Sequence, residues 1–384
     1  MRHRSVARAA RRGWWLPVLT TLALILAACS SESGPENGQN SLRPNGEPAH
    51  QIDNLFTPIM WVAVAIGIFI LAATIFVAVR FRQRKGSDGR PKQIHGNTPL
   101  EIGWTLVPAL ILAVIAVPTV SVIFDIAEKP AHPFEITVVA KQWWWQFDYP
   151  KQDGVDQKFV TADEMHIPTG RDVYLTLTAC DASLGTTGKR DNCNVIHSFW
   201  VPELAGKRDV VPGHDNTVKL RTDKAGTYLG QCAEYCGLSH ANMRFRVIVQ
   251  SPDDFASWVA GQQVGPAVPL ADAGDATALF TKKFQCTNCH TTENSSTSVY
   301  GPNLTHLASR TTFASGYYEL TRANLISWIL NAPGMIPMQS EDCRLPPPAT
   351  CVGMPSFTKN TPKGYPVMTK AEAETLADYL LELE

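Results

Sequence analysis

Two long stretches without a charged residue constrain the fold of this 384-residue chain more than any other feature. Ile59–Val79 and Ile102–Phe124 are uncharged over 21 and 23 positions. A hydrocarbon core about 30 Å thick is crossed by about 20 apolar residues in a helix. Both stretches therefore predict transmembrane helices, and we place a helical hairpin at residues 55–128. A charged share of only 18% agrees with a chain partly embedded in a membrane.

The segment between the two stretches is strongly basic, with a single acidic residue, Asp88. Its basic residues are Arg80, Arg82, Arg84, Lys85, Arg90 and Lys92. The positive-inside rule places such a loop in the cytoplasm, so both outer ends of the hairpin face the opposite side. A single anchor would not need a second span, and the hairpin therefore predicts packing against partner helices.

Residues 1–28 predict a signal peptide of the lipoprotein type, because five arginines precede a short apolar run. The sequence Leu26-Ala27-Ala28-Cys29 resembles a bacterial lipobox, which implies lipidation of Cys29. An uncleaved signal anchor is the alternative. Residues 29–54, rich in Ser, Gly, Asn and Pro, predict a linker. A net charge of -1 and the absence of a basic patch argue against a nucleic-acid partner.

Residues 130–255 predict one Greek-key β domain. Four short runs alternate β-branched or aromatic residues with polar ones, and Gly, Pro and Asp separate them. Evenly spaced strands of this kind are typical of a sandwich or barrel. The runs are Phe134–Val139, Asp172–Leu177, Thr217–Leu220 and Arg244–Val249.

A cluster of soft ligands in this domain predicts a copper centre. Thiolate, imidazole and thioether groups together suit copper. A mononuclear blue-copper site uses one Cys, so a second Cys four residues away predicts two thiolates that bridge two copper ions. A structural zinc site and a disulfide are the alternatives, and the added imidazoles and thioether argue against both. The residues are His197, Cys232, Cys236, His240 and Met243.

Residues 55–250 resemble subunit II of cytochrome c oxidase. Beside the copper motif, three separated motifs carry the resemblance: Leu100-Glu101-Ile102-Gly103-Trp104, Gln142-Trp143-Trp144-Trp145-Gln146-Phe147 and Lys207-Arg208-Asp209-Val210-Val211-Pro212-Gly213. The resemblance implies a cupredoxin-like Greek-key barrel. It also implies that the dinuclear copper centre is bound by the five side chains above and by the backbone carbonyl of Glu234. Quinol-oxidising relatives lack these ligands.

The resemblance implies three further roles. The carboxylate of Glu234 would hold a magnesium or manganese ion shared with the catalytic subunit. Glu101 would lie at the mouth of a proton pathway, although the residue alone is equally compatible with solvation by headgroups. Trp143 would be the aromatic through which electrons enter the copper centre, the alternative being a packed strand residue. Strand alternation predicts Trp143 and Trp145 on one face and Trp144 on the other.

Residues 256–276 predict a linker, and residues 277–384 resemble an all-α class I cytochrome c domain. Cys286-Thr287-Asn288-Cys289-His290 is the attachment signature of c-type haem, with both thiols bonded to the haem vinyl groups and His290 as the proximal ligand. A thioredoxin-like pair is the alternative, but no βαβ pattern surrounds it. Helices are expected at Asn324–Leu330 and at Thr369–Leu383, with Thr369 as N-cap.

Met354 is the predicted sixth ligand of that haem. It lies between Gly353 and Pro355, and proline restricts the preceding residue to an extended conformation. Met338 is the main competitor, because the insert at residues 340–352 lengthens the loop. Packing of Met354 against the haem edge, without ligation, is the other alternative.

Four cysteines remain after these assignments. Cys180 and Cys193 flank one loop, and Cys343 and Cys351 flank another. Export permits disulfides, so local pairing within each loop is expected.

These expectations describe the subunit through which electrons enter a haem–copper terminal oxidase in the bacterial inner membrane, with the copper and haem domains on the periplasmic side. The donor would be a cytochrome c or a cytochrome bc complex, and the acceptor catalytic subunit I, which reduces dioxygen with proton pumping. A subunit of a copper-bearing nitric oxide reductase is the harder alternative to exclude. The propeller repeats of a nitrous oxide reductase are absent, and a copper-delivery lipoprotein needs neither hairpin nor haem.

Overall fold

A computed structural model of the chain describes residues 38–82, 93, 95–179, 195–292, 300–338, 353–358 and 365–384. The predicted signal peptide with Cys29, most of the basic loop, and the two predicted cysteine pairs lie outside these residues.

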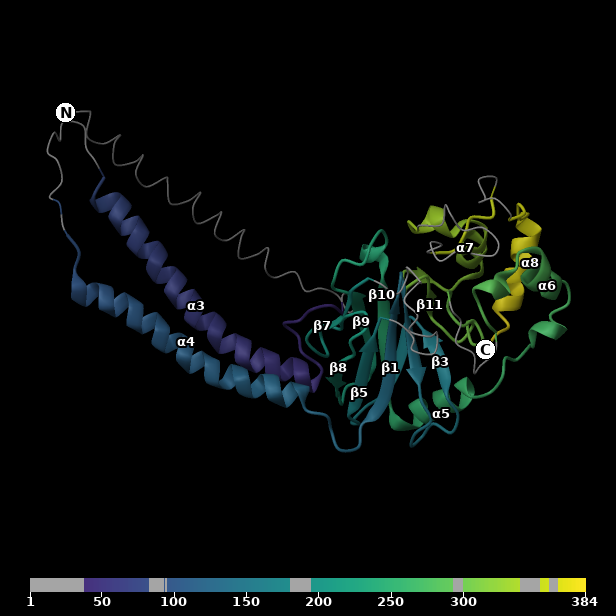
Figure 1. The fold of residues 1–384 in the computed structure, drawn as a ribbon, viewed down its shortest axis with the longest axis horizontal. Helices are drawn as coiled ribbons and strands as arrows, with labels where there is room; N and C mark the ends of the chain where they lie inside the picture. Colours follow the sequence, from purple (N-terminus) through teal and green to yellow (C-terminus); the bar gives the residue numbers. More distant parts are fainter. Residues whose placement is uncertain are drawn as a thin grey trace, which may run out of the picture. The chain divides into compact units, whose positions relative to one another are not determined.

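The predicted hairpin consists of helices α3 (Glu47–Arg80) and α4 (Thr98–Ala127), which contact each other (Figure 1). Each is long and apolar enough to cross a membrane. Helix α3 begins before residue 55, so the end of the linker predicted at 29–54 is helical. The start of α4 is capped at Asn97, whose side chain accepts from the amide of Leu100, while its own amide donates to the carboxylate of Glu101.

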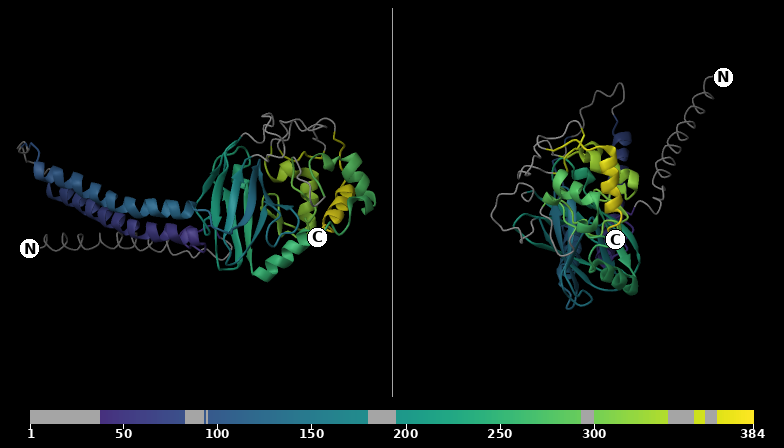
Figure 2. Two further views of the ribbon diagram at one scale, coloured as in Figure 1. Left: turned by 60° about the horizontal axis from the view of Figure 1, so that its bottom comes forward. Right: turned by 90° about the vertical axis from the view of Figure 1, so that its right-hand side faces the viewer.

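The β domain contains two five-stranded sheets (Figure 2). One has the order β3-β2-β1-β5-β8 and the other β4-β10-β9-β6-β7. The first contains β1 (Phe134–Lys141), β2 (Trp144–Tyr149), β3 (Phe159–Ala162), β5 (Val173–Thr178) and β8 (Asn216–Leu220). The second contains β4 (Glu164–Pro168), β6 (His197–Trp200), β7 (Arg208–Val210), β9 (Gly226–Cys232) and β10 (Arg244–Gln250). All four runs singled out in the sequence are strands.

Aromatic side chains join the two sheets. Phe245 of β10 stacks on Phe199 of β6 with ring centroids 4.6 Å apart, and it lies 5.1 Å from the ring of Trp145 of β2. Trp143 and Trp145 both belong to this core. Because β2 begins only at Trp144, strand alternation does not account for the position of Trp143. The core thus fixes β6 and β9, which carry His197 and Cys232, and β10, which directly follows Met243.

The C-terminal unit has a separate hydrophobic core built around Phe280, Phe284, Leu325 and Leu376. Its regular elements are α6 (Asp275–Ala278), the π-turn η5 (Leu279–Lys283), the 3₁₀ turn η6 (Cys286–Asn288), α7 (Arg322–Met335) and α8 (Lys370–Leu380). A short ladder of β11 (Thr312–Phe313) and β12 (Tyr318–Glu319) departs from the all-α expectation. The predicted N-cap is confirmed, because Thr369 and Glu372 form a capping box.

Helix α5 (Pro252–Gln262) connects the two parts, preceding the 3₁₀ turn η4 (Leu270–Asp272). Its side chains Phe255 and Val259 are buried in the core of the β domain. The linker predicted from residue 256 therefore begins inside a helix, because apolar residues spaced by one helical turn give α5 a face to bury.

We predict that Gly230→Ala destabilises the β domain by about 1–3 kcal/mol, since overpacking a filled core has a cost of that order. A Cβ at this position would lie 2.2 Å from the Phe245 ring. Thermal unfolding of the solubilised chain measures the effect. The matched control is Gly261→Ala in α5, where nothing lies within 4 Å of the new Cβ. A helical Gly→Ala change is expected to be neutral or stabilising by up to about 1 kcal/mol. Equal unfolding temperatures for Gly230→Ala and the unmutated chain would contradict the prediction.

Candidate metal centre and the adjoining pocket

Strand pairing places the first two predicted copper ligands side by side. His197 begins β6 and Cys232 ends β9, and these strands pair through Phe199 opposite Cys232. The chain then turns at Gly237, whose φ is +118°, and returns through η3 (His240–Asn242). The amide of Cys232 donates to the carbonyl of Met243 over 2.9 Å, which closes the loop.

The loop brings together every predicted copper ligand. The two thiol sulfurs are 3.8 Å apart. Cys232 Sγ lies 3.8 Å from His197 Nδ1 and 3.2 Å from the carbonyl oxygen of Glu234. Cys236 Sγ lies 3.7 Å from both His240 Nδ1 and Met243 Sδ. Each sulfur therefore has one imidazole and one weaker donor beside it.

This donor set fits metal ions better than a disulfide. A disulfide needs sulfurs about 2.05 Å apart, well below the 3.8 Å observed. Two sulfurs at that separation can both lie about 2.3 Å from a common metal ion. The side chains of His197 and Met243 are fully buried and Cys232 and Cys236 nearly so, which excludes water from the site.

The two thiols share one proton. A hydrogen bond from Cys236 lowers the pKa of Cys232 to about 3. The same bond, together with burial, raises the pKa of Cys236 far above its usual range, because a second thiolate would lie next to the first. Cations that bind between the sulfurs would remove this repulsion and release the remaining proton.

Glu234 presents its two oxygen-bearing groups differently. Its carbonyl oxygen faces Cys232 Sγ, whereas its carboxylate accepts a hydrogen bond from the amide of Tyr235 over 3.0 Å. The residue is half-buried. The carbonyl of Glu234 is thus available to the copper site while its carboxylate is available to another metal ion. The predicted dual role requires this separation.

Trp143 and Gln142 hold the copper-ligand loop from one side. The indole Nε1 of Trp143 donates to the carbonyl of Cys236 over 3.1 Å, and Gln142 Nε2 donates to the same oxygen over 2.6 Å. A Cβ on Gly237 would lie 3.0 Å from Gln142 Nε2 and 3.1 Å from the Trp143 ring. The backbone at residue 237 can approach Gln142 and Trp143 this closely only because glycine has no side chain.

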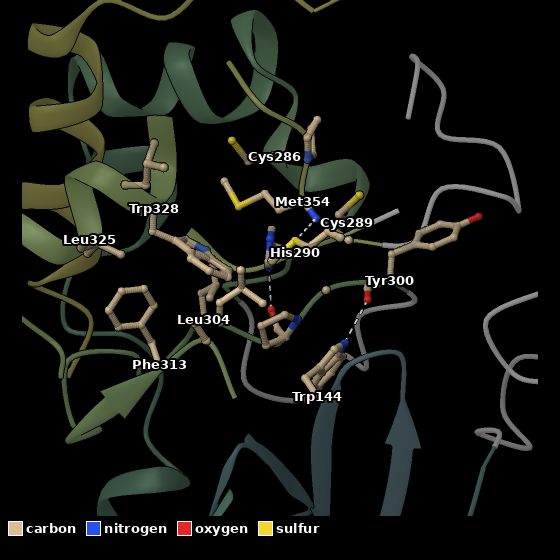
Figure 3. A pocket seen from close by; sticks show the side chains of 18 of the residues that line it. Trp144, Cys286, Cys289, His290, Tyr300, Leu304, Phe313, Leu325, Trp328 and Met354 are labelled. Atoms are coloured by element: carbon tan, nitrogen blue, oxygen red, sulfur yellow. Dashed lines mark hydrogen bonds between the residues drawn. The ribbon is translucent and has the colours of Figure 1, made fainter. Parts of the chain in front are cut away.

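Trp143 also lines a second site, which is a pocket. Figure 3 shows Cys286, Cys289 and His290 in this pocket. His290 Nδ1 lies 2.9 Å from the carbonyl oxygen of Pro302, so this nitrogen carries the proton and Nε2 is the one left as a ligand atom. A Cβ on Gly301 would lie 2.5 Å from the His290 ring. The 301–302 segment therefore fixes the orientation of the imidazole.

The cysteines of this pocket differ electrostatically from those of the β domain. Burial raises the pKa of Cys286 to about 12 and that of Cys289 to about 11. They remain neutral thiols, the form in which a thiol is added across a vinyl group. Phe280, Leu304, Phe313 and Trp328 supply apolar walls. The residues present thus fit a covalently attached haem.

The two candidate methionines pack differently. Both line the pocket, and the amide of Met354 lies 3.3 Å from Met338 Sδ. Met338 packs against the core of the β domain, whereas Met354 packs against the core of the C-terminal unit, with its side chain among Cys286, Cys289 and His290 (Figure 3). This packing favours Met354 as the ligand.

Sequence reasoning missed one group of pocket residues. Asp163 and Arg310 line the pocket, and Glu164 accepts hydrogen bonds from Thr311 and Thr312. No local motif marks these residues, because 147 positions separate Glu164 from Thr311. Glu101 lies in the first turn of α4, exposed, where it caps the helix; its predicted proton-pathway role stays a prediction.

The apolar hairpin, the two-sheet domain and the buried Cys–His site together define a membrane-anchored protein with a buried metal-binding site. Residues 37–122 match the family described as cytochrome C oxidase subunit II, transmembrane domain, and residues 134–251 match its periplasmic domain. The chain belongs to the cytochrome c oxidase subunit II family. It is a component of a haem–copper terminal oxidase, with the β domain outside the membrane, and membership implies a CuA copper centre.

Individual proteins named cytochrome c oxidase subunit 2 are similar to this chain over most of its length. Cytochrome c oxidase subunit 2 of Alkalihalophilus pseudofirmus is 33% identical over 95% of this chain and 96% of its own length, so the alignment extends into the C-terminal unit. The protein of the same name from Bacillus subtilis is 31% identical over 84% of this chain and 90% of its own length. A crystal structure of the periplasmic domain of subunit II from Bradyrhizobium japonicum is 30% identical, with a TM-score of 0.29 over 34% of this chain and 94% of its own.

We predict that Cys232→Ser or Cys236→Ser abolishes the near-infrared absorption and paramagnetic signal of a thiolate-bridged copper pair, because one thiolate cannot bridge two ions symmetrically. Spectra and copper content of the purified chain measure this. Cys289→Ser is the matched control and retains the copper signal, since Cys289 belongs to the other site. An unchanged mixed-valence spectrum in either copper-loop variant would refute the ligand assignment.

Proposed function

We propose that this chain is the subunit through which electrons enter the oxidase, using a c-type haem in the C-terminal unit and a dinuclear copper centre in the β domain. One observation carries the proposal. Trp143 hydrogen-bonds the copper loop at the carbonyl of Cys236 and also lines the pocket of Cys286, Cys289 and His290. A single aromatic residue therefore borders both sites.

Both metal groups, when bound, would each carry one electron at a time. Cys232 and Cys236 would bridge the two coppers. His197 and the carbonyl of Glu234 lie beside one sulfur, and His240 and Met243 beside the other. Rigid, buried ligands change little in geometry when the charge changes, so reorganisation stays small and transfer fast.

In the pocket, Cys286 and Cys289 would form the thioether links to the haem, and His290 and Met354 would bind its iron. The hydrogen bond from His290 to Pro302 orients the imidazole. A thioether is a weak, soft ligand that favours reduced iron and raises the potential. Trp143, fixed through Cys236 and 7% exposed, would conduct electrons between the two sites.

Two carboxylates would serve the neighbouring catalytic subunit I. The carboxylate of Glu234 would bind a magnesium or manganese ion at that interface, and Glu101 would lie at the mouth of a proton pathway. Subunit I would accept the electrons and reduce dioxygen to water with proton pumping. The donor would be a cytochrome c or a cytochrome bc complex, and further oxidase subunits would complete the assembly.

The chain would span the bacterial inner membrane twice and be anchored to lipid through Cys29. The family match favours an oxidase over the nitric oxide reductase subunit that the residues left open.

Purification of the tagged chain from its native membrane tests the proposal. We expect a catalytic haem–copper subunit to co-purify, a haem that stays attached to this chain under denaturing conditions, and dioxygen consumption with a reduced cytochrome. Co-purification with a subunit that consumes nitric oxide and not dioxygen, or a chain without covalent haem, would contradict it.

We predict that Glu234→Gln keeps both coppers and weakens binding of the non-redox metal about tenfold or more, because metal-ligand and outer-shell substitutions have effects of that size. Only the carboxylate changes, while the backbone carbonyl remains. Paramagnetic resonance of the manganese-substituted oxidase measures the metal. Loss of copper with retention of manganese would reverse the roles that we assign to this residue.

Met354→Ala, but not Met338→Ala, is expected to abolish the weak red-region band that marks methionine–iron(III) ligation and to lower the haem potential, because the thioether ligand is lost. Absorption spectra and redox titration of the oxidised chain measure both. Met338→Ala is the control, since this methionine lines the same pocket but packs on the other core. Loss of the band in Met338→Ala alone would assign the ligand to Met338.

A further inference from the structure

The β11–β12 hairpin of the C-terminal unit reaches the β domain through an unusual turn. Ala314, Ser315 and Gly316 have φ values of +53°, +58° and +69°. Two of them are not glycine, and L-residues adopt this region only at a cost that surrounding contacts must offset. The contacts that hold this turn lie on the β domain.

Glu164 holds the segment that leads into this turn. Its side chain accepts from both the amide and the hydroxyl of Thr311, and from both the amide and the hydroxyl of Thr312, over 2.6–3.1 Å to Oε1. The residue is 2% exposed. A buried carboxylate with several donors forms strong charge-assisted hydrogen bonds, whereas one without donors is costly. Glu164 therefore requires the hairpin to be in place.

Asp163 extends the contact toward Trp143. Its Oδ1 accepts from the amide of Trp145 over 2.9 Å, and its Oδ2 accepts from the amide of Ser315 over 3.0 Å. The hydroxyl of Ser315 donates to the backbone carbonyl of Trp143. The pKa of Asp163 rises to about 7 through burial, against its amide hydrogen bonds and the charge of Arg310. The hairpin tip thus bonds the residue that we place between the two sites.

Three further contacts join the β domain to the C-terminal unit. The indole nitrogen of Trp144 donates to the carbonyl of Tyr300 over 3.3 Å (Figure 3). The hydroxyl of Ser239, three residues past Cys236, donates to the carbonyl of Pro337. The guanidinium of Arg244 lies 5.0 Å from the ring centre of Tyr317. In this arrangement Trp143 and Trp144 are only 7% and 8% exposed.

The geometry points to a built-in docking latch, in which Asp163 and Glu164 hold the segment Thr311–Ser315 and so keep the C-terminal unit over Trp143. Asp163 and Glu164 are positioning residues. The latch closes the Trp143 face to any soluble donor protein, so an external donor reaches the copper centre only by way of the C-terminal unit. This consequence rests on the proposed function, whereas the latch itself does not.

Covalent connection makes such a latch effective. Two surfaces on one chain meet at a high effective concentration, so modest contacts keep them together. The cost of leaving Glu164 buried without donors adds to the preference for the closed arrangement. A collision complex with a separate donor would have to desolvate this pair at each encounter.

Hydrogen–deuterium exchange of the full chain in the assembled oxidase tests the latch. In the unmutated chain, we expect the amides of Thr311, Thr312 and Ser315 to be protected. Glu164→Ala should speed exchange of Thr311 and Thr312 about tenfold or more, since charge-assisted bonds are lost, while β1 and β5 stay protected. Glu135→Ala is the matched control, an exposed carboxylate of the same domain that pairs with Lys129.

Hydroxyl-radical labelling provides a second readout. Trp143 and Trp144 should be labelled several-fold more in Glu164→Ala than in the unmutated chain, relative to the fully buried Trp145. If Glu164→Ala also loosens β4, Thr312→Val removes one donor from the opposite side and should produce a smaller change in the same direction.

Unchanged exchange in both variants, or ready labelling of Trp143 in the unmutated chain, would overturn the latch. Neither measurement requires redox activity. A protected, Glu164-dependent hairpin on a chain without covalent haem would support the latch and refute the proposed function. Covalent haem with an unprotected hairpin would do the reverse.

Discussion

The carbonyl oxygen of Cys236 is the point on which the two sites of this protein depend. It accepts hydrogen bonds from the side chains of Gln142 and Trp143, and its own residue supplies one sulfur of the metal centre. A loop held at this oxygen cannot move without moving the ligand. Trp143 in turn belongs to the core of the β domain, so packing between the two sheets determines where the sulfurs lie.

The surroundings of the two cysteine pairs give chemically identical thiols different pKa values. Cys232 and Cys236 face imidazoles and each other, and a shared proton lowers the pKa of Cys232 to about 3. Cys286 and Cys289 lie among apolar side chains, and burial raises both pKa values to about 11–12. A pair in which one thiol is already ionised suits metal ions, and a neutral pair suits covalent addition. The two cysteine pairs of one chain are thus suited to different chemistry.

Buried polar groups join the parts of the chain more specifically than apolar contact could. Glu164 and Asp163 find their donors on the hairpin of the C-terminal unit, and Ser315 finds its acceptor on Trp143. An apolar surface would permit several relative placements of similar energy, whereas a buried carboxylate tolerates only the one that supplies its donors. The hydroxyl of Ser315 thereby bonds the residue that borders both the Cys232–Cys236 site and the pocket of Cys286, Cys289 and His290.

The sequence by itself determined the hairpin, four of the strands and the position of the two cysteine–histidine motifs, because each rests on a local signal. Twenty uncharged residues predict a span, alternation predicts β1, β5, β8 and β10, and the spacings of Cys232–Met243 and Cys286–His290 are readable within a dozen positions. Its errors were at boundaries, as in α5, where tertiary burial continued a helix into a predicted linker, and in the all-α expectation for the C-terminal unit, where β11 and β12 form a short ladder. Only the tertiary structure decided which core each candidate methionine packs against and which carboxylates hold the hairpin. Met338 and Met354 are chemically identical and differ in the core they contact, and Glu164 is separated from Thr311 by 147 residues, a distance over which no local pattern carries information.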